Sequence, residues 1–182
     1  MTEAPPSEAS LKGGPMVTKE RFAQGMTFQQ YLDQMGTNKE KFVQFLGEIK
    51  IKPEDRAALD RLGSKLKILV LTEDWCGDAL YNVPVLARMV EGNPNIELRV
   101  FLRDKNPDLT NQYLNQGIYR SIPVFAFFDE GMNELARFIE RPPAQTEEIE
   151  KKMLEARRAL RAERSLEWRE GVVREIRSLL KV

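Results

Sequence analysis

The stretch that decides the fold is residues 66–79, which read LKILVLTEDWCGDA. Its first six residues are leucine, isoleucine and valine except for Lys67, which is typical of a strand covered on both faces of a sheet. Residues 77–91 then carry apolar side chains on one side of a helix. Cys76, the single cysteine of the chain, therefore falls at an exposed turn between a buried strand and a helix.

The same periodicities predict the other elements on both sides of this stretch. The expected helices are 27–35, about 38–47, 53–62, 77–91, 109–114 and about 144–180, and the expected strands are 66–71, 96–102, 124–128 and 134–139. Gly171 is the expected interruption of the last helical region. This order indicates an α/β sandwich with a mixed sheet, because parallel strands need helical crossovers.

Three features in this order resemble the thioredoxin-like family over roughly residues 65–160. They are the motif WCGDA at residues 75–79, Pro84 eight residues past Cys76, and Ile122-Pro123 directly before a strand. The resemblance implies a central mixed β-sheet flanked by helices, with extra N-terminal helices and a long C-terminal helical segment. It also implies that Pro123 corresponds to the family's cis-proline, which stands beside the active cysteine and exposes backbone to an extended substrate.

We expect four regions along the chain. Residues 1–15 are rich in proline, glycine and small polar residues, so they are predicted to form a disordered tail. Residues 16–62 are expected to form a helical N-terminal extension, 63–163 the thioredoxin-like domain, and 164–182 a C-terminal helix.

Cys76 is the predicted catalytic residue. A cysteine at a helix start is favoured as thiolate by the helix dipole, but Glu73, Asp74 and Asp78 oppose that effect, so the direction of its pKa shift is open. The family's second cysteine, three residues later, is replaced by Ala79. A two-cysteine cycle within one chain is therefore excluded, and the prediction is a monothiol thiol–disulfide oxidoreductase with an external resolving thiol.

The predicted substrate-binding residues surround Cys76. They are Trp75, Gly77, Asp78, Ile122 and Pro123. Gly77 permits close approach of backbone, Trp75 could cover the sulfur, and Asp78 could cap the helix or steer polar substrates. Each has a structural alternative: core packing for Trp75, simple capping for Asp78, and the opening of an edge strand for Pro123.

Other functions compete with this one. A catalytically inactive thioredoxin-fold module could use the groove beside Pro123 to bind peptides or proteins, and an inert buried Cys76 would suit that role. A glutaredoxin-like role would also suit one cysteine, although the motif differs. A peroxiredoxin-type peroxidase is disfavoured, because Glu73 stands where that group has threonine and Thr72 is one residue off.

Composition excludes several classes of function. The chain has no histidine, which removes serine–histidine and cysteine–histidine catalysis and imidazole-dependent zinc sites. Its 28 basic and 28 acidic residues give no global field for nucleic acid, and the longest apolar run, residues 122–128, is too short to cross a membrane. We expect no metal, no cofactor and, without a secretory signal, a cytoplasmic location.

An apolar stripe near the C-terminus bears on partners. It consists of Trp168, Val172, Val173, Ile176, Leu179 and Leu180. The stripe could form a homodimer or pack on the N-terminal helices of the same chain. The expected substrate is a protein or a low-molecular-weight thiol or disulfide.

Overall fold

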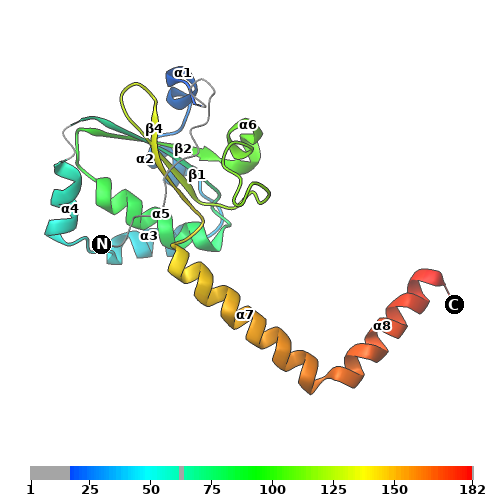
Figure 1. Cartoon of the computed structure of the whole chain (residues 1–182). Coiled ribbons are helices and arrows are strands. Elements are labelled where there is room, and N and C mark those ends of the chain that lie inside the picture. The colour runs from blue at the N-terminus through cyan, green and yellow to red at the C-terminus, as the bar shows by residue number, and fades with distance from the viewer. Residues whose placement is uncertain (1–16, 62–63, 182) are drawn as a thin grey trace, which may run out of the picture. The chain divides into compact units, whose positions relative to one another are not determined.

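The structure is a computed structural model that describes residues 17–61 and 64–181 (Figure 1). The tail expected at residues 1–15 lies outside the described residues. The chain divides into two compact units, Met1–Glu140 and Arg141–Val182, and each is described by itself. The expected boundaries at residues 63 and 164 stay predictions.

A four-stranded mixed sheet forms the centre of the first unit (Figure 1). Its strands are β1 (Leu66–Thr72), β2 (Ile96–Leu102), β3 (Val124–Phe128) and β4 (Glu134–Ile139). They lie in the order β2-β1-β3-β4, with β1 parallel to β2 and the other pairs antiparallel. The expected fold class is confirmed.

Helix α5 (Gly77–Val90) connects the two parallel strands, and its buried face includes Leu80, Val83 and Leu86. The 3-10 turn η1 (Arg103–Lys105) and helix α6 (Pro107–Thr110) follow β2. Helix α6 starts and ends earlier than the expected 109–114. It begins at Pro107, because a proline fits the first turn of a helix, where the backbone N–H has no helical partner.

Four helices precede the sheet, where the sequence predicts three. They are α1 (Lys19–Ala23), α2 (Phe28–Gln34), α3 (Lys39–Glu48) and α4 (Pro53–Asp60). Helix α1 has only five residues and too short a pattern to be detected, but Thr18 caps it and Phe22 is buried. Helix α2 begins with a capping box between Thr27 and Gln30.

The helices cover the sheet on both sides. Figure 1 shows α3, α4 and α5 together on one side and α1 and α6 on the other. Lys67 of β1 lies over the Phe22 ring of α1. Since side chains alternate along a strand, Ile68, Val70 and Thr72 point to the side covered by α5.

A short antiparallel bridge between Met26 and Val100 adds backbone pairing at the edge of β2. Gly25 precedes it, and a Cβ at Gly25 would lie only 2.6 Å from the Phe101 ring. The segment between α1 and α2 therefore runs directly against β2.

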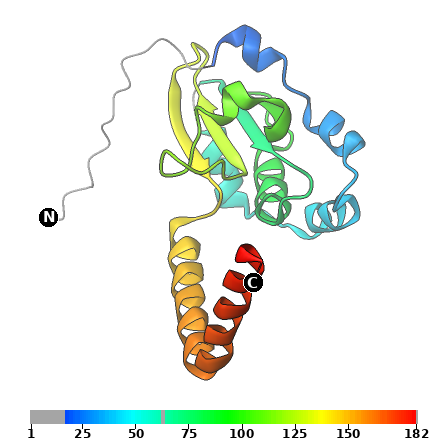
Figure 2. The ribbon, with the colours of Figure 1, turned by 90° about the vertical axis from the view of Figure 1, so that its right-hand side faces the viewer.

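The second unit contains α7 (Pro143–Glu163) and α8 (Ser165–Leu180), which meet at Arg164 (Figure 2). Gly171 was expected to interrupt the helix but lies inside α8, because glycine keeps its N–H and breaks no helical hydrogen bond. The described side chains of the apolar stripe, from Val172 to Leu180, are 49 to 72% exposed. A homodimer through this stripe stays a prediction. Within the described residues, no helix is long and apolar enough to cross a membrane.

Candidate functional site

Cys76 is the N-cap residue of α5, directly after the loop that leaves β1. Its Sγ donates a hydrogen bond to the carbonyl oxygen of Ile122, with 3.4 Å between the two atoms. The Ile122–Pro123 peptide bond is cis in this structure, and Pro123 is buried. The fold thus brings Cys76 against Ile122, 46 positions later in the sequence, and Ile122 is bonded to Pro123, the third of these predicted site residues.

The sulfur is more enclosed than the sequence suggests. Cys76 was expected on an exposed turn, yet only 9% of its surface is exposed, because Ala79 and Ile122 pack in the same core cluster. Burial raises the pKa of the Cys76 thiol, and the charge of Asp78 adds to this effect. The backbone N–H groups of Ala79 and Asp78 and the charge of Arg103 oppose it without reversing it. The protonated thiol is therefore the resting form at neutral pH.

Trp75 lies beside Cys76 with 47% of its surface exposed, so core packing does not explain it. The guanidinium carbon of Arg103 stands 4.8 Å from the centroid of its ring, within the range of a cation–π contact. Arg103 also donates to the carbonyl oxygen of Arg120, with an N–O distance of 3.2 Å. Arg103 therefore links the exposed tryptophan to the loop that leads to Ile122.

Sequence reasoning missed Arg103, although one signal could have found it. It directly follows β2, which is parallel to β1. The carboxyl ends of neighbouring parallel strands lie at the same edge of a sheet, so a cation after β2 is placed near the turn after β1.

The buried side chain of Glu73 holds the turn that precedes Cys76. It is buried, and its Oε1 accepts a hydrogen bond from the backbone N–H of Asp104 at 2.8 Å. Burial raises the pKa of the Glu73 carboxyl, against the effect of that hydrogen bond. Glu73 thus ties the loop after β1 to the turn after β2.

Asp74 anchors the same turn to the N-terminal segment. Its Oδ2 accepts hydrogen bonds from the backbone N–H groups of Gly36 and Thr37, at 2.8 and 3.0 Å. The side-chain amide of Asn38 donates to the Asp74 carbonyl oxygen at 3.0 Å. These partners lie 36 to 38 residues upstream, so the sequence offered no local signal for them.

Gly77 and Asp78 complete the predicted set. A Cβ at Gly77 would meet no atom within 4 Å, so the space beside this backbone is open to a ligand. Asp78 is half-buried in the first turn of α5, where a negative charge suits the helix dipole. Its capping role and its substrate role both stay predictions.

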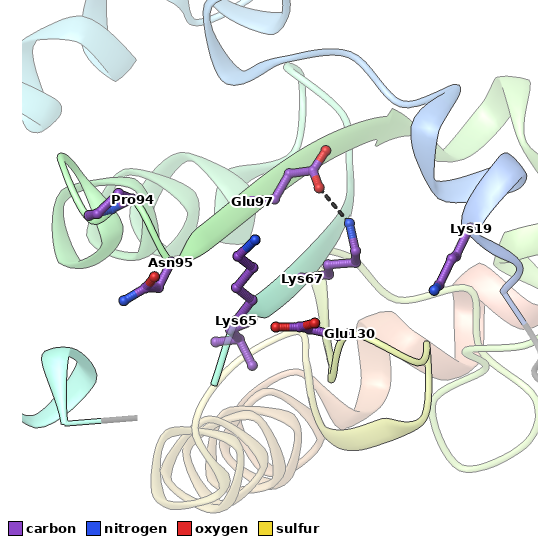
Figure 3. Close-up of a pocket in the computed structure, with 8 residues that line it drawn as sticks. Lys19, Lys65, Lys67, Pro94, Asn95, Glu97 and Glu130 are labelled. Atoms are coloured by element: carbon purple, nitrogen blue, oxygen red, sulfur yellow. Dashed lines mark hydrogen bonds and ion pairs between the residues drawn. The ribbon is translucent and has the colours of Figure 1, made fainter. Parts of the chain in front are cut away.

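No group of three or more histidine, cysteine, aspartate or glutamate residues that could hold a metal ion occurs in the described part of the chain. One pocket is lined by Lys19, Lys65, Leu66, Lys67, Pro94, Asn95, Glu97 and Glu130 (Figure 3). In it, Lys67 and Glu97 point toward one another and form an ion pair. The pocket lies at the amino end of β1 and Cys76 follows the carboxyl end, so the two are separate.

The comparisons with known proteins decide the family. A family model described as thioredoxin matches residues 25–157. The chain belongs to the thioredoxin family. The match begins before β1, so it includes part of the segment that we expected to be an extension.

Two solved structures show what this thioredoxin-family chain is similar to. One is a protein of unknown function, PA1234 from Pseudomonas aeruginosa, with 27% identity, a TM-score of 0.59, and coverage of 68% of this chain and 76% of that chain. The other is an HIV epitope scaffold, with 27% identity, a TM-score of 0.61, and coverage of 70% and 79%. A comparison with curated proteins gave no match. These likenesses agree on the fold, and neither description names an activity.

Proposed function

We propose that this protein is a monothiol thiol–disulfide oxidoreductase that acts through Cys76. The observation that carries the proposal is the 3.4 Å hydrogen bond from Cys76 Sγ to the Ile122 carbonyl oxygen. It puts the one sulfur nucleophile of the chain at a helix start and against the backbone before Pro123. A substrate that pairs with this backbone would bring its own sulfur to Cys76.

Thiol–disulfide exchange at Cys76 proceeds in two steps. Cys76 loses its proton to solvent, and the thiolate attacks one sulfur of a disulfide, R–S–S–R′. A bond forms between Cys76 Sγ and the R sulfur while R′–S⁻ leaves and takes up a proton. An external thiol then attacks the mixed disulfide, becomes joined to R, and releases Cys76 as thiol. Since Ala79 offers no nucleophile, the reducing equivalents come from that external thiol.

The surroundings of Cys76 suit both steps. The N–H groups at the start of α5 and the charge of Arg103 favour the thiolate when the sulfur ionises. Exposed Trp75 and the open space beside Gly77 provide surface for the R group. The substrate is a protein disulfide or a low-molecular-weight disulfide. A cytoplasmic setting, which keeps small thiols reduced, would supply the resolving thiol.

Incubation with oxidised glutathione tests the proposal, with intact mass as the readout. We expect the wild-type protein to gain one glutathione, and added reduced glutathione to remove it. The Cys76→Ser variant should gain none. The rate should rise with pH, because the thiolate is the attacking species.

The binding-module reading has one observation in its favour, namely the burial of Cys76 with its raised pKa. It predicts that the folded protein gains no glutathione between pH 7 and 9.5, whereas the urea-unfolded protein does. That result would sink the enzymatic proposal. A glutathione adduct on the folded protein that reduced glutathione reverses would sink the binding module as the main function.

A further inference from the structure

Helices α7 and α8 expose their apolar side chains. Among their described residues only Thr146 and Gly171 are half-buried, and all the others are exposed. The two helices diverge from Arg164 (Figure 1), so neither covers the apolar face of the other. Most of the stability of a helix in a protein comes from packing such a face, so these helices call for a partner surface.

The apolar face of α7 has the spacing of a coiled-coil seam. Ile149, Met153, Ala156 and Leu160 follow one another at intervals of four, three and four residues, and we call these four residues the α7 seam. This alternation keeps side chains in one stripe that packs against another helix. The three large side chains are 39 to 50% exposed, and no residue of α7 is buried. The seam is therefore open in the described chain.

The charges of α7 are divided between its two ends. Residues 147–155 carry four glutamates and two lysines, whereas residues 156–164 carry four arginines and one glutamate. The first half is therefore net negative and the second half net positive. Two antiparallel copies of α7, related by a twofold axis, place the acidic half of each against the basic half of the other.

The seam residues give a register for this antiparallel pair. With Met153 opposite Ala156 of the partner subunit, a large side chain meets a small one on each side of the twofold axis. The same register puts Ile149 opposite Leu160 of the partner subunit. Every residue of the seam thus faces an apolar residue, as knobs-into-holes packing requires.

The charges beside the seam favour the antiparallel pair over a parallel one. In the antiparallel register Glu150 lies beside Arg157 of the partner subunit, and the twofold axis makes this pair twice. A parallel pair would instead bring Lys152 beside Arg157 of the partner subunit, which are like charges. The positions three and four residues from Glu150 and from Arg157 hold no opposite charge, so α7 itself offers neither of them an ion-pair partner.

Helix α8 adds a second apolar surface to the same unit. Leu166, Val173 and Leu180 recur every seven residues, and Ile176 lies between the last two on the same face. These side chains are 50 to 68% exposed. Two copies of the unit therefore supply four apolar helix faces, which is the number that a four-helix bundle needs.

We propose that the α7 seam binds the α7 seam of a second copy of this chain in antiparallel orientation, so that the protein is a twofold-symmetric dimer. The inference does not depend on thiol–disulfide exchange at Cys76. A membrane surface is a poorer occupant of the seam, because anionic lipids would repel the acidic half of α7.

Charge reversals beside the seam test the proposal, and the readout is the dissociation constant of the dimer, measured by analytical ultracentrifugation of the full chain. We expect Glu150→Arg and Arg157→Glu each to raise the dissociation constant about tenfold, because each change replaces two opposite-charge pairs by two like-charge pairs. The two changes combined in one chain should restore the wild-type value, because both pairs are then opposite in charge again.

The matched control is Arg158→Glu, the same change at the next position of α7, which the helical repeat turns away from the seam. It should leave the dissociation constant unchanged, and circular dichroism checks that each variant keeps its helices. A wild-type chain that stays monomeric from low to high micromolar concentrations would overturn the proposal and would mean that the apolar faces pack on the same chain or on a membrane. A dimer that Glu150→Arg weakens no more than Arg158→Glu does would use another surface. Failure of the combined variant to recover would exclude the antiparallel pair.

Discussion

The Oδ2 atom of Asp74 lies 2.8 Å from the backbone nitrogen of Gly36, and the hydrogen bond between them joins the N-terminal segment to the turn that holds Cys76. Thr37 adds a second N–H to the same oxygen. The residues before β1 are therefore more than an appended extension. They fix the loop that positions the sulfur, and they contribute the buried side chain of Tyr31 to the core.

We expect Asp74→Ala to lower the free energy of unfolding by about 1 to 2 kcal/mol, because two backbone donors lose a charged acceptor. Asp74→Asn should cost less, since the amide oxygen can still accept. Urea unfolding at pH 7 measures both. The control is Asp33→Ala, which removes an exposed carboxylate that accepts from Gln29 one turn away and should cost under about 0.5 kcal/mol. If the two alanine variants lose the same free energy of unfolding, the Asp74 contact does not hold the turn.

The sheet could be predicted closely from the sequence. The ranges 96–102, 124–128 and 134–139 agree with β2, β3 and β4, because their alternating or continuous apolar runs end at turn residues. Helix α1 and the end of α7 could not be predicted. The first is too short for a periodic pattern, and the second occurs at Arg164, where no glycine or proline marks it.

The candidate site could be predicted in part. Cys76 and Ile122-Pro123 were found because motif and order carry them, and the structure puts Cys76 against Ile122. The burial of Cys76 could not be predicted, because it depends on segments distant in sequence. Asp74 acts through contacts made only by the folded chain, and nothing in its local sequence distinguishes it. Arg103 could have been noticed only from its position directly after β2.

A substitution at Gly25 tests the packing of the N-terminal segment on β2. In Gly25→Ala the new Cβ would lie 2.6 to 2.7 Å from Phe101 and from Arg99 Cβ, so backbone or ring must move. We expect a loss of about 1 to 3 kcal/mol in unfolding free energy. Gly47→Ala is the matched control: Gly47 lies within α3 with nothing within 4 Å of its Cβ position, so the change should stabilise by about 0.5 to 1 kcal/mol. Similar stabilities for the two variants would contradict the close approach.

Substitutions at Arg103 test whether its positive charge acts on the Cys76 thiol. We expect Arg103→Gln to raise the pKa of the Cys76 thiol and to slow its alkylation at pH 8 about twofold, because a nearby positive charge favours the thiolate. Arg103→Lys should keep most of the rate. The control is Arg21→Gln, which removes a similar stacked guanidinium from Phe101 and should leave the rate unchanged. An unchanged rate in Arg103→Gln would exclude Arg103 from the chemistry.

The pH dependence of stability tests the burial of Cys76. Burial raises the pKa of its thiol above the unfolded value of about 8.5. Between those two pKa values the native thiol keeps a proton that the unfolded chain has lost. Its contribution to stability is therefore fully present below about pH 8.5 and is lost as the pH rises through the folded pKa.

Urea unfolding of wild type and Cys76→Ser between pH 7 and 10.5 measures this contribution. The effect of Tyr113 occurs in both proteins and cancels in the difference, which therefore reports Cys76 together with its electrostatic coupling to Tyr31. We expect the unfolding free energy of wild type, relative to that of the serine variant, to be constant up to about pH 8.5 and to decrease above it. An increase with pH would mean that the native pKa lies below the unfolded one, so that Cys76 is an activated thiolate rather than a buried thiol that ionises only as substrate arrives.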